Sequence, residues 1–292
     1  MLDFIRINKI KKHLKIPRMS QLVEKKTLSI RLQKEERFFQ FWKERNLSKI
    51  NFITMLATVA SVSNNLSWIF FSAYQCAIRY HFKQKFNGTI SLAVRELKSA
   101  PMKTTYQRNK KSFLFSGQKS WLVSTNVDMI LLFVKLDKTI RLSLNNKKTD
   151  LNSVLVPIYR EQSVTRSTFE KRKILEHLNQ GNLTLRETHI LDENILSGKN
   201  IRGFAASEQF FVMLSLGIFF VTKVKSTKLK KNFFNAVETL IIDFNTSYSP
   251  KLRLKYHKKI FIKLIYIFDR LPERKVISNW NSDKIMFLKL LN

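Results

Sequence analysis

The stretch FLFSGQKSWLVSTNVDMILLFVK occupies residues 113–135, in the middle of a chain of 292 residues. Alternating apolar and polar residues at its start predict a β-strand, and Ser116 and Gly117 predict a turn after it. The residues around Trp121 then alternate again and predict the return strand. Residues 129–134 form a continuous apolar run of strand length, which is typical of a strand buried on both faces. The stretch therefore predicts a β domain in the middle of the chain.

The sequence on either side of this stretch extends the β domain and then changes period. Residues 89–97, 154–158 and 182–190 have the composition of further strands, so the β domain is predicted over residues 88–203. Residues 20–86 instead repeat their apolar positions at helical spacing, with a predicted break near residues 63–65. We therefore expect an N-terminal helical domain over residues 1–87.

The helical period returns after the β domain. Residues 210–221 are apolar on every side, which predicts a helix in the centre of a bundle. Apolar residues recur every three to four positions across residues 229–244 and 260–268, and a last short helix is predicted over residues 283–291. The sequence thus predicts a C-terminal helical bundle over residues 204–292, which gives the chain an α+β organisation.

The charge balance of the chain is strongly basic. Lys and Arg number 53 against 21 Asp and Glu, which gives a formal net charge of +32. Such an excess favours nucleic acid, an anionic membrane or another acidic partner, although AT-biased coding is an alternative origin. Basic clusters at residues 9–15, 223–231 and 251–259 include Phe233 and Tyr256 among their lysines, a composition that suits a phosphate backbone. No helix-turn-helix, zinc-finger or RNP pattern accompanies them.

Several common kinds of site have no support in the sequence. Neither a GxGxxG nor a GxxxxGK[ST] pattern occurs, so a Rossmann or P-loop phosphate site is not predicted. The five histidines show no i, i+4 pairing, and no metal site is expected. Cys76 is the single cysteine, which favours a reducing compartment. With no signal peptide visible and no apolar run near the roughly 20 residues of a membrane span, we expect a cytoplasmic protein without a transmembrane segment.

Five short motifs of the middle domain occur in an order that resembles one known family. They are GTISLAVRE (88–96), FSGQKSWLVS (115–124), DMILLFV (128–134), VLVP (154–157) and LRETHILDENIL (185–196), the last followed by Gly203 and Phe204. This series resembles the middle domain of the acyl-CoA dehydrogenases. The resemblance implies an N-terminal helical domain, a middle β-barrel domain and a C-terminal helical bundle, which is short in this chain. It also implies a homo-oligomer, in which neighbouring copies complete the bundle.

The resemblance implies a flavoprotein oxidoreductase that acts on CH–CH groups of an acyl-CoA or another small substrate, with FAD as the expected cofactor rather than FMN. The implied cofactor-binding residues lie in the loop of the first motif and on the strand of the second, where the tryptophan would pack on the flavin ring: Arg95, Glu96, Leu97, Trp121, Val123 and Ser124. On its strand pattern alone, Trp121 is more typical of a plain core residue than of a cofactor contact.

Two positions depart from the family pattern. Arg95 and Val123 stand where the family has threonine, so two hydroxyl groups that would face the flavin are missing. The departures leave open a relative that has lost the flavin or its turnover, and the net charge leaves open a nucleic-acid-binding protein.

The catalytic base of the family, a glutamate before Gly-Thr, has no counterpart here. Glu273 occupies the rough position, between the third and last predicted helices of the bundle. Glu208 lies near an alternative position on the first helix of the bundle, one residue out of register. One residue on a helix corresponds to about 100° of rotation, so a charged residue near a helix start is the simpler interpretation of Glu208.

Overall fold

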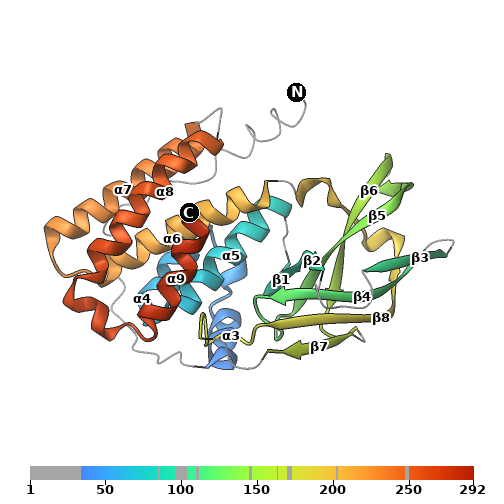
Figure 1. The fold of residues 1–292 in the computed structure, drawn as a ribbon, viewed down its shortest axis with the longest axis horizontal. Coiled ribbons are helices and arrows are strands. Elements are labelled where there is room, and N and C mark those ends of the chain that lie inside the picture. The colour runs from blue at the N-terminus through green and yellow to red at the C-terminus, as the bar shows by residue number, and fades with distance from the viewer. Residues whose placement is uncertain are drawn as a thin grey trace. The chain divides into compact units, whose positions relative to one another are not determined.

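The computed structural model describes residues 34–83, 86–96, 104–109, 112–144, 147–162, 164–169, 173–201, 203–246 and 250–292. Leu97, the first basic cluster and the predicted helical segment before residue 34 lie outside the described residues. The chain divides into two compact units, which we call the helical unit and the β unit. The helical unit holds the chain through residue 85, Lys173–His177 and Ala205–Asn292, and the β unit holds Phe86–Arg172 and Leu178–Phe204 (Figure 1).

The two helical segments that the sequence predicts as separate domains lie in one unit. A hydrogen bond joins them, because Ser215 Oγ donates to the carbonyl oxygen of Ile69 at 3.0 Å, and the Phe52 and Phe211 rings lie in edge contact with centroids 5.3 Å apart. The helices of the unit are α3 (Glu35–Glu44), α4 (Phe52–Val62), α5 (Leu66–Phe82), α6 (Phe204–Lys223), α7 (Thr227–Thr246), α8 (Pro250–Asp269) and α9 (Trp280–Leu291), with the short 3₁₀ turns η2 (Leu47–Lys49) and η5 (Pro272–Val276).

The predicted break near residues 63–65 is confirmed, and asparagine caps explain it. The Asn51 side chain accepts a hydrogen bond from the backbone of Thr54 at 2.9 Å and caps α4. The Asn65 side chain accepts from the backbone of Trp68 at 3.1 Å and caps α5. Because such a cap satisfies a backbone N–H that has no partner within the helix, each asparagine favours a new helix start.

Helix α6 is the central helix that the sequence predicts. Every residue from 210 to 221 is buried, and Gly217 lets α7 approach closely, since a Cβ there would lie 2.3 Å from Val237 Cγ2. The helix is long and apolar enough to cross a membrane by length and composition alone. However, 78% of its most apolar window is buried inside the structure, as expected for a core helix.

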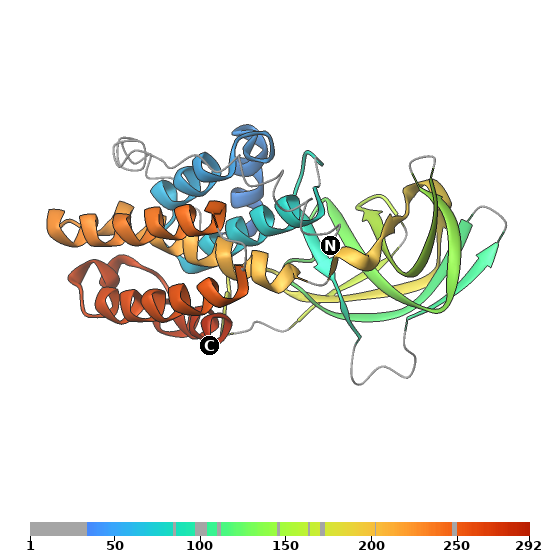
Figure 2. The ribbon, with the colours of Figure 1, turned by 90° about the horizontal axis from the view of Figure 1, so that it is seen from above.

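The β unit consists of two sheets, which Figure 2 shows curving around a shared interior. One sheet has the order β1-β5-β6-β9, and the other has the order β2-β4-β8-β7 with β3 also paired to β4. Phe113 and Phe115 of β4 stack with ring centroids 5.7 Å apart and are fully buried. The strands are β1 (Ile90–Ala93), β2 (Arg95–Glu96), β3 (Thr105–Asn109), β4 (Ser112–Leu122), β5 (Met129–Leu144), β6 (Lys147–Tyr159), β7 (Thr165–Thr168), β8 (Gly181–Leu191) and β9 (Leu196–Ser197).

The predicted turn at Ser116 and Gly117 is wrong. Strand β4 runs through both residues and pairs with β8 along its length. The register shifts between Phe115 and Gly117, and Gly117 has φ 136°, a value that glycine adopts without strain. From Phe115 to Gly117 the partners on β8 run from Thr188 to Leu185, so the extra residue of this β-bulge lies in β8, opposite the Ser-Gly pair. The predicted return strand is the second half of β4. The strands predicted at residues 129–134, 154–158 and 182–190 are confirmed within β5, β6 and β8.

A buried carboxyl group holds the helical unit together. Asp283 of α9 is fully buried, accepts a hydrogen bond from the Leu175 backbone N–H at 2.7 Å and another from Ser67 Oγ at 3.3 Å. Asn279 adds a hydrogen bond to the side chain of Glu176. These contacts tie residues 173–177 to α5 and α9. Burial raises the pKa of Asp283 from 3.8 to about 6, although the two hydrogen bonds act in the opposite direction.

We predict that Asp283 makes the protein less stable as pH rises from 4 to 7. A carboxyl whose pKa is raised on folding binds its proton more tightly in the folded state, so its contribution is present below pH 4 and is lost as pH passes through about 6. Each pKa unit corresponds to about 1.4 kcal/mol, which amounts to about 3 kcal/mol here. Asp283→Asn keeps an acceptor for Leu175 and removes the titration.

Urea unfolding of the parent and of Asp283→Asn at pH 4 and pH 7 measures this contribution. The free-energy difference between the two proteins should shift by about 2.4 kcal/mol in favour of the variant between these pH values, because part of the full contribution is already lost at pH 4. Glu193→Gln, at an exposed position, controls for the loss of one negative charge. Parallel pH profiles for the parent and Asp283→Asn would contradict the prediction.

Candidate functional site

The most unusual backbone in the β unit lies at Trp121, near the end of β4. The β4–β8 register passes from Lys119 opposite Leu183 to Leu122 opposite Gly181, so two residues of β4 face one residue of β8. Trp121 takes up the extra length with φ 61°. A bulky side chain in this left-handed region costs on the order of 1–3 kcal/mol, and such strain is concentrated at functional sites.

Polar side chains from β8 and the segment before it hold the strained tryptophan in place. Its indole Nε1–H donates to Gln180 Oε1 at 3.0 Å, and its backbone N–H approaches Asn182 Oδ1 at 3.4 Å. Gln180 is only 5% exposed, so its amide is a fixed acceptor. The indole is therefore oriented at both its backbone and its ring.

The bulge also moves Trp121 out of the core. Residues 113, 115, 117 and 119 face the interior, and every second residue of a regular strand faces the same side. In a regular strand Trp121 would therefore also face the interior. Leu122 instead takes the buried position, with no exposed surface, while Trp121 remains half-buried. Trp121 is therefore only partly buried, at the edge of the core. A half-exposed indole in a fixed orientation is suited to packing against a planar ligand.

The loop after β4 is fastened to its surroundings. Ser124 N–H donates to Ser91 Oγ at 3.3 Å, and Ser91 Oγ donates in turn to the Ser124 carbonyl at 3.0 Å. Arg166 Nη1 donates to the carbonyls of Thr125 and Val127 at 3.1 and 2.7 Å. Burial lowers the pKa of Arg166 from its usual value, with Arg160 as a further cause. The loop is therefore a rigid edge beside Trp121.

Two of the predicted cofactor-binding residues have buried side chains. Val123 and Ser124 are both fully buried, and Ser124 Oγ accepts a hydrogen bond from the Asn126 N–H at 3.1 Å. The serine hydroxyl is therefore already engaged within the loop. A ligand would meet these two residues through their backbone.

The first predicted motif lies against the second. Strand β2 pairs with β4 so that Arg95 is opposite Ser120 and Glu96 is opposite Lys119. Arg95 is exposed and is placed one residue from Trp121 in the register. Only the backbone of Glu96 is described. Segments around residues 95 and 121, separated in sequence, thus meet at one end of the sheet.

Sequence reasoning missed three residues of this region. Gln180 and Asn182 orient Trp121, and no local pattern marks either of them, because their role depends on a bulge in another strand. Lys119 is 1% exposed on the inward face of β4. Its alternation with Phe113 and Phe115 could have shown that it points inward. A buried ammonium group requires hydrogen-bond or charged partners. Lys119 therefore makes the interior of the β unit polar next to the bulge.

Glu273 has a structural role in the helical unit. Its Oε1 accepts a hydrogen bond from the Lys225 backbone N–H at 2.9 Å, which joins η5 to the segment before α7. This hydrogen bond is the main cause of a lowered pKa for Glu273. A carboxylate of lowered pKa is a weaker base, so the arrangement disfavours Glu273 as a proton acceptor. Glu208 lies half-buried near the start of α6.

Neither the single cysteine nor a metal cluster provides a competing site in the described part of the chain. Burial raises the pKa of the Cys76 thiol well above its ordinary value, which keeps it from acting as a nucleophile. No group of three or more His, Cys, Asp or Glu side chains among the described residues is placed to hold a metal ion. The bulge at Trp121 is therefore the strongest candidate site.

The helices, the two-sheet β unit and the returning helical bundle together define an acyl-CoA dehydrogenase-like fold. The chain is similar to the prolyl acyl carrier protein oxidase AnaB, with 13% identity, 99% of this chain and 96% of that chain covered, and a TM-score of 0.56. It is similar to FMN-bound TdsC from Paenibacillus sp. A11-2, with 9% identity and a TM-score of 0.61. The match covers 99% of this chain and 94% of that chain. An acyl-CoA dehydrogenase from Geobacillus kaustophilus is also similar, at 10% identity and a TM-score of 0.52. This match covers 99% of this chain and 96% of that chain.

No protein-family model matches the sequence, and comparison with curated proteins finds no match. At these identities the similarity establishes the fold. The resemblance that the five motifs indicate is therefore confirmed for the fold, and the roles of individual residues stay predictions.

We predict that glycine is better tolerated than alanine at position 121. In the left-handed region glycine is favoured over alanine by about 1 kcal/mol, whereas in a regular strand alanine is favoured by roughly 0.5–1 kcal/mol. Both variants remove the indole, so their difference reports the backbone alone. Trp121→Gly should unfold at higher urea concentration than Trp121→Ala. The opposite order would show that residue 121 has ordinary strand geometry.

Proposed function

We propose that this chain is a divergent flavoprotein oxidoreductase of the acyl-CoA dehydrogenase type, which oxidises an acyl thioester or another small substrate through bound flavin. The fold supports the proposal, since its solved neighbours include an FMN-bound protein and an acyl carrier protein oxidase. The observation that carries it is Trp121, whose strained backbone and fixed, half-exposed indole occur at the position that the family resemblance assigns to a flavin contact.

The residues around Trp121 fit a flavin ring. The indole of Trp121 has a flat face on which a planar ring can stack. Its N–H, at the edge of the ring, already donates to Gln180, so the face is the part that can bind a ligand. The rigid loop after β4 presents backbone groups beside it. Exposed Arg95 supplies a positive charge in the adjacent strand, which suits an anionic cofactor such as FAD or FMN.

The proposed reaction removes two hydrogens from adjacent carbons. Flavin, when bound, supplies a two-electron acceptor for the hydride that leaves the carbon β to the carbonyl. A carboxylate of the chain takes the proton from the α carbon, and a C=C bond remains. Glu208 and Glu273 are the two candidates for this base, and the lowered pKa of Glu273, which accepts a hydrogen bond from the Lys225 backbone, disfavours Glu273. Repeated turnover would also require an external electron acceptor.

A flavin-binding relative without turnover is the second candidate function. Two observations favour it: Val123 replaces a hydroxyl residue of the family with a buried side chain, and the Ser124 hydroxyl is engaged within its own loop. Flavin contacts in this chain would then rest on Trp121 and on backbone groups. Such a protein would bind flavin weakly and would not reduce it with substrate.

The first test is flavin binding. The purified chain, incubated with FAD and separately with FMN and then freed of excess ligand, should show flavin absorbance. Trp121→Ala should weaken binding by roughly 2- to 10-fold, because an aromatic contact contributes about 0.5–1.5 kcal/mol beyond its buried area. Trp121→Phe keeps a ring and serves as the matched control. A parent protein that retains neither flavin would refute the proposal and its second candidate together.

The second test separates turnover from binding. Under anaerobic conditions, acyl-CoA and carrier-bound acyl thioesters should bleach the flavin of the active protein. Glu208→Gln should retain flavin, but the rate of bleaching should fall by about 100-fold or more, as expected for loss of a general base. Glu273→Gln should bleach at the parent's rate. Retained flavin that no thioester bleaches would favour the second candidate. Equal loss in both glutamine variants would remove Glu208 as the specific base.

A further inference from the structure

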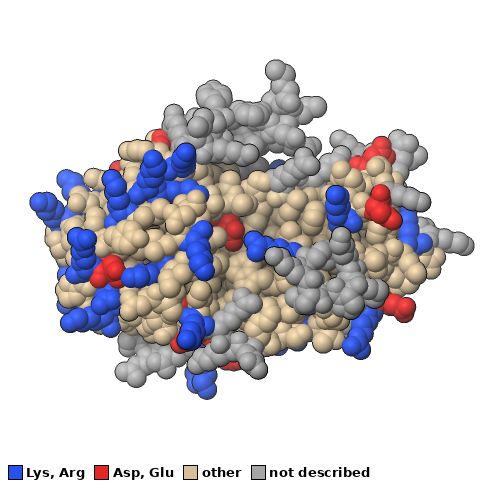
Figure 3. Space-filling view, viewed as in Figure 1, with Lys and Arg blue, Asp and Glu red and all other residues tan. Residues whose placement is uncertain are grey.

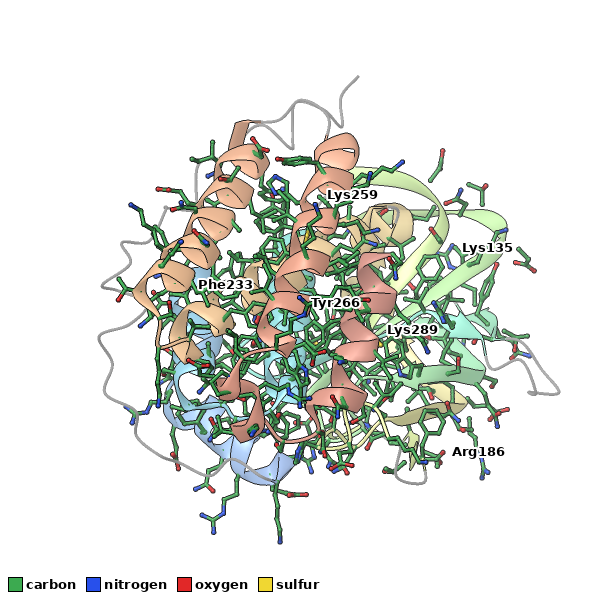
Figure 4. The ribbon with its side chains drawn as sticks, turned by 60° about the vertical axis from the view of Figure 1, so that its left-hand side comes forward. Lys135, Arg186, Phe233, Lys259, Tyr266 and Lys289 are labelled. Atoms are coloured by element: carbon green, nitrogen blue, oxygen red, sulfur yellow. The ribbon has the colours of Figure 1, made fainter. Side chains whose placement is uncertain are left out.

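Helix α8 presents a basic and aromatic stripe to solvent, which we call the α8 face. Its exposed residues recur at three- to four-residue spacing, so they share one side of the helix. Tyr256 is 61% exposed and Tyr266 is 51% exposed, which is unusual for large aromatic side chains. Figure 4 shows Lys259 and Tyr266 along this helix. The α8 face consists of Lys255, Tyr256, Lys259, Lys263, Tyr266, Ile267 and Arg270.

No described acidic side chain opposes this charge on α8. The acidic residue of the helix, Asp269, is held at its end by Trp280 Nε1 at 2.6 Å and by Lys284 Nζ at 2.8 Å. Asp269 therefore satisfies groups of α9 and does not neutralise the α8 face.

The helices on either side extend the positive surface. Helix α8 packs against both α7 and α9, and Figure 3 shows Lys and Arg gathered over α7 and α8. At the exposed positions described on these two neighbours, charged side chains are all basic: Lys228 and Lys231 on α7, and Lys289 on α9. Glu238 and Asp243, both half-buried, are the acidic side chains of α7. The exposed charge over the three helices is thus mostly positive, and such a surface attracts polyanions and steers their approach.

Two occupants are disfavoured by these observations. A second copy of the chain would bring another net charge of +32 towards a surface that is already basic. A membrane-inserted helix must bury its apolar side in the acyl boundary. The apolar side of α8 is already used in the core of the helical unit, where Phe261, Ile265 and Phe268 are buried.

We propose that the α8 face binds single-stranded nucleic acid, with its lysines and Arg270 on the phosphates and Tyr256 and Tyr266 stacked on bases. Exposed aromatic rings between basic side chains are the combination that such ligands use. At a rise of 1.5 Å per residue, the two rings lie about 15 Å apart along the helix. The stripe as a whole is about 22 Å long, which can accommodate a site of several nucleotides.

The test uses the full-length chain and a fluorescein-labelled oligo(dT) of 20 nucleotides, with binding followed by anisotropy between 50 and 200 mM salt. The parent should bind, with affinity falling steeply as salt increases. Lys259→Gln combined with Lys263→Gln should reduce the salt slope by about 1.4, because each lost single-strand phosphate contact removes about 0.7. Binding without a salt slope would overturn the proposal.

A matched double variant tests whether location matters. Lys135→Gln combined with Arg186→Gln removes the same charge from exposed positions of the β unit, which Figure 4 also labels. This variant should keep the parent's salt slope. An equal reduction in both double variants would show that net charge alone drives binding, and the α8 face would be rejected as the site.

The tyrosines test the stacking part of the proposal. Tyr256→Ala combined with Tyr266→Ala should weaken oligo(dT) binding by on the order of 30-fold or more, since each stacked base contributes about 1–3 kcal/mol. Phenylalanine at both positions keeps the rings and should bind within about 2-fold of the parent. All these side chains are exposed, so unchanged circular dichroism should accompany each variant.

Vesicles containing phosphatidylserine and an acidic folded protein serve as competing ligands. Oligo(dT) binding that persists in their presence, and that depends on the tyrosine rings, supports the proposal. Tight binding to vesicles or to the acidic protein, with no binding to oligo(dT), would overturn it and would assign the face to that other class of partner. Flavin content is measured separately, so a failure here leaves the proposed oxidoreductase untouched.

Discussion

The β-bulge at Trp121 is the constraint on which the candidate site depends. Two residues of β4 share one partner position on β8, and the chain absorbs the difference by placing a tryptophan in left-handed backbone. Asn182 of β8 and Gln180, the residue before that strand, hold this conformation. Without the bulge, residue 121 would continue the inward alternation of β4 and become part of the core. The strain is thus coupled to the exposure of the ring.

Much of the helical architecture could be predicted because its causes are local. Asn51 and Asn65 cap the helices that follow them, and a capping asparagine is visible in sequence. The burial of α6 follows from a segment that is apolar on every side. The merging of the two helical segments into one unit depends on contacts between residues such as Ile69 and Ser215, which lie far apart in the chain. No periodicity reveals such a contact.

The β unit shows where local reasoning fails. Ser116-Gly117 is a good turn sequence, yet glycine with a positive φ also fits within a strand that lies opposite a bulge. The choice is made by β8, which pairs on both sides of the bulge. The same limit applies to the site: Trp121 was identified through a family resemblance, whereas Gln180 could not be, because its role comes from its position opposite the second bulge. The buried side chains of Val123 and Ser124 follow from the loop hydrogen bonds, which sequence does not show.

The route of the chain through residues 173–177 has a consequence for how the protein is made. These residues dock on α5 and α9 through Asp283 and Asn279, although the sequence on both sides of them belongs to the β unit. The helical unit is therefore assembled from three separate pieces of the chain. During synthesis, α5 must wait for α6 and α9 to leave the ribosome before its contacts with them form, whereas most of the β unit emerges as one block. Such a delay leaves apolar surface of α5 exposed on the nascent chain, which favours aggregation.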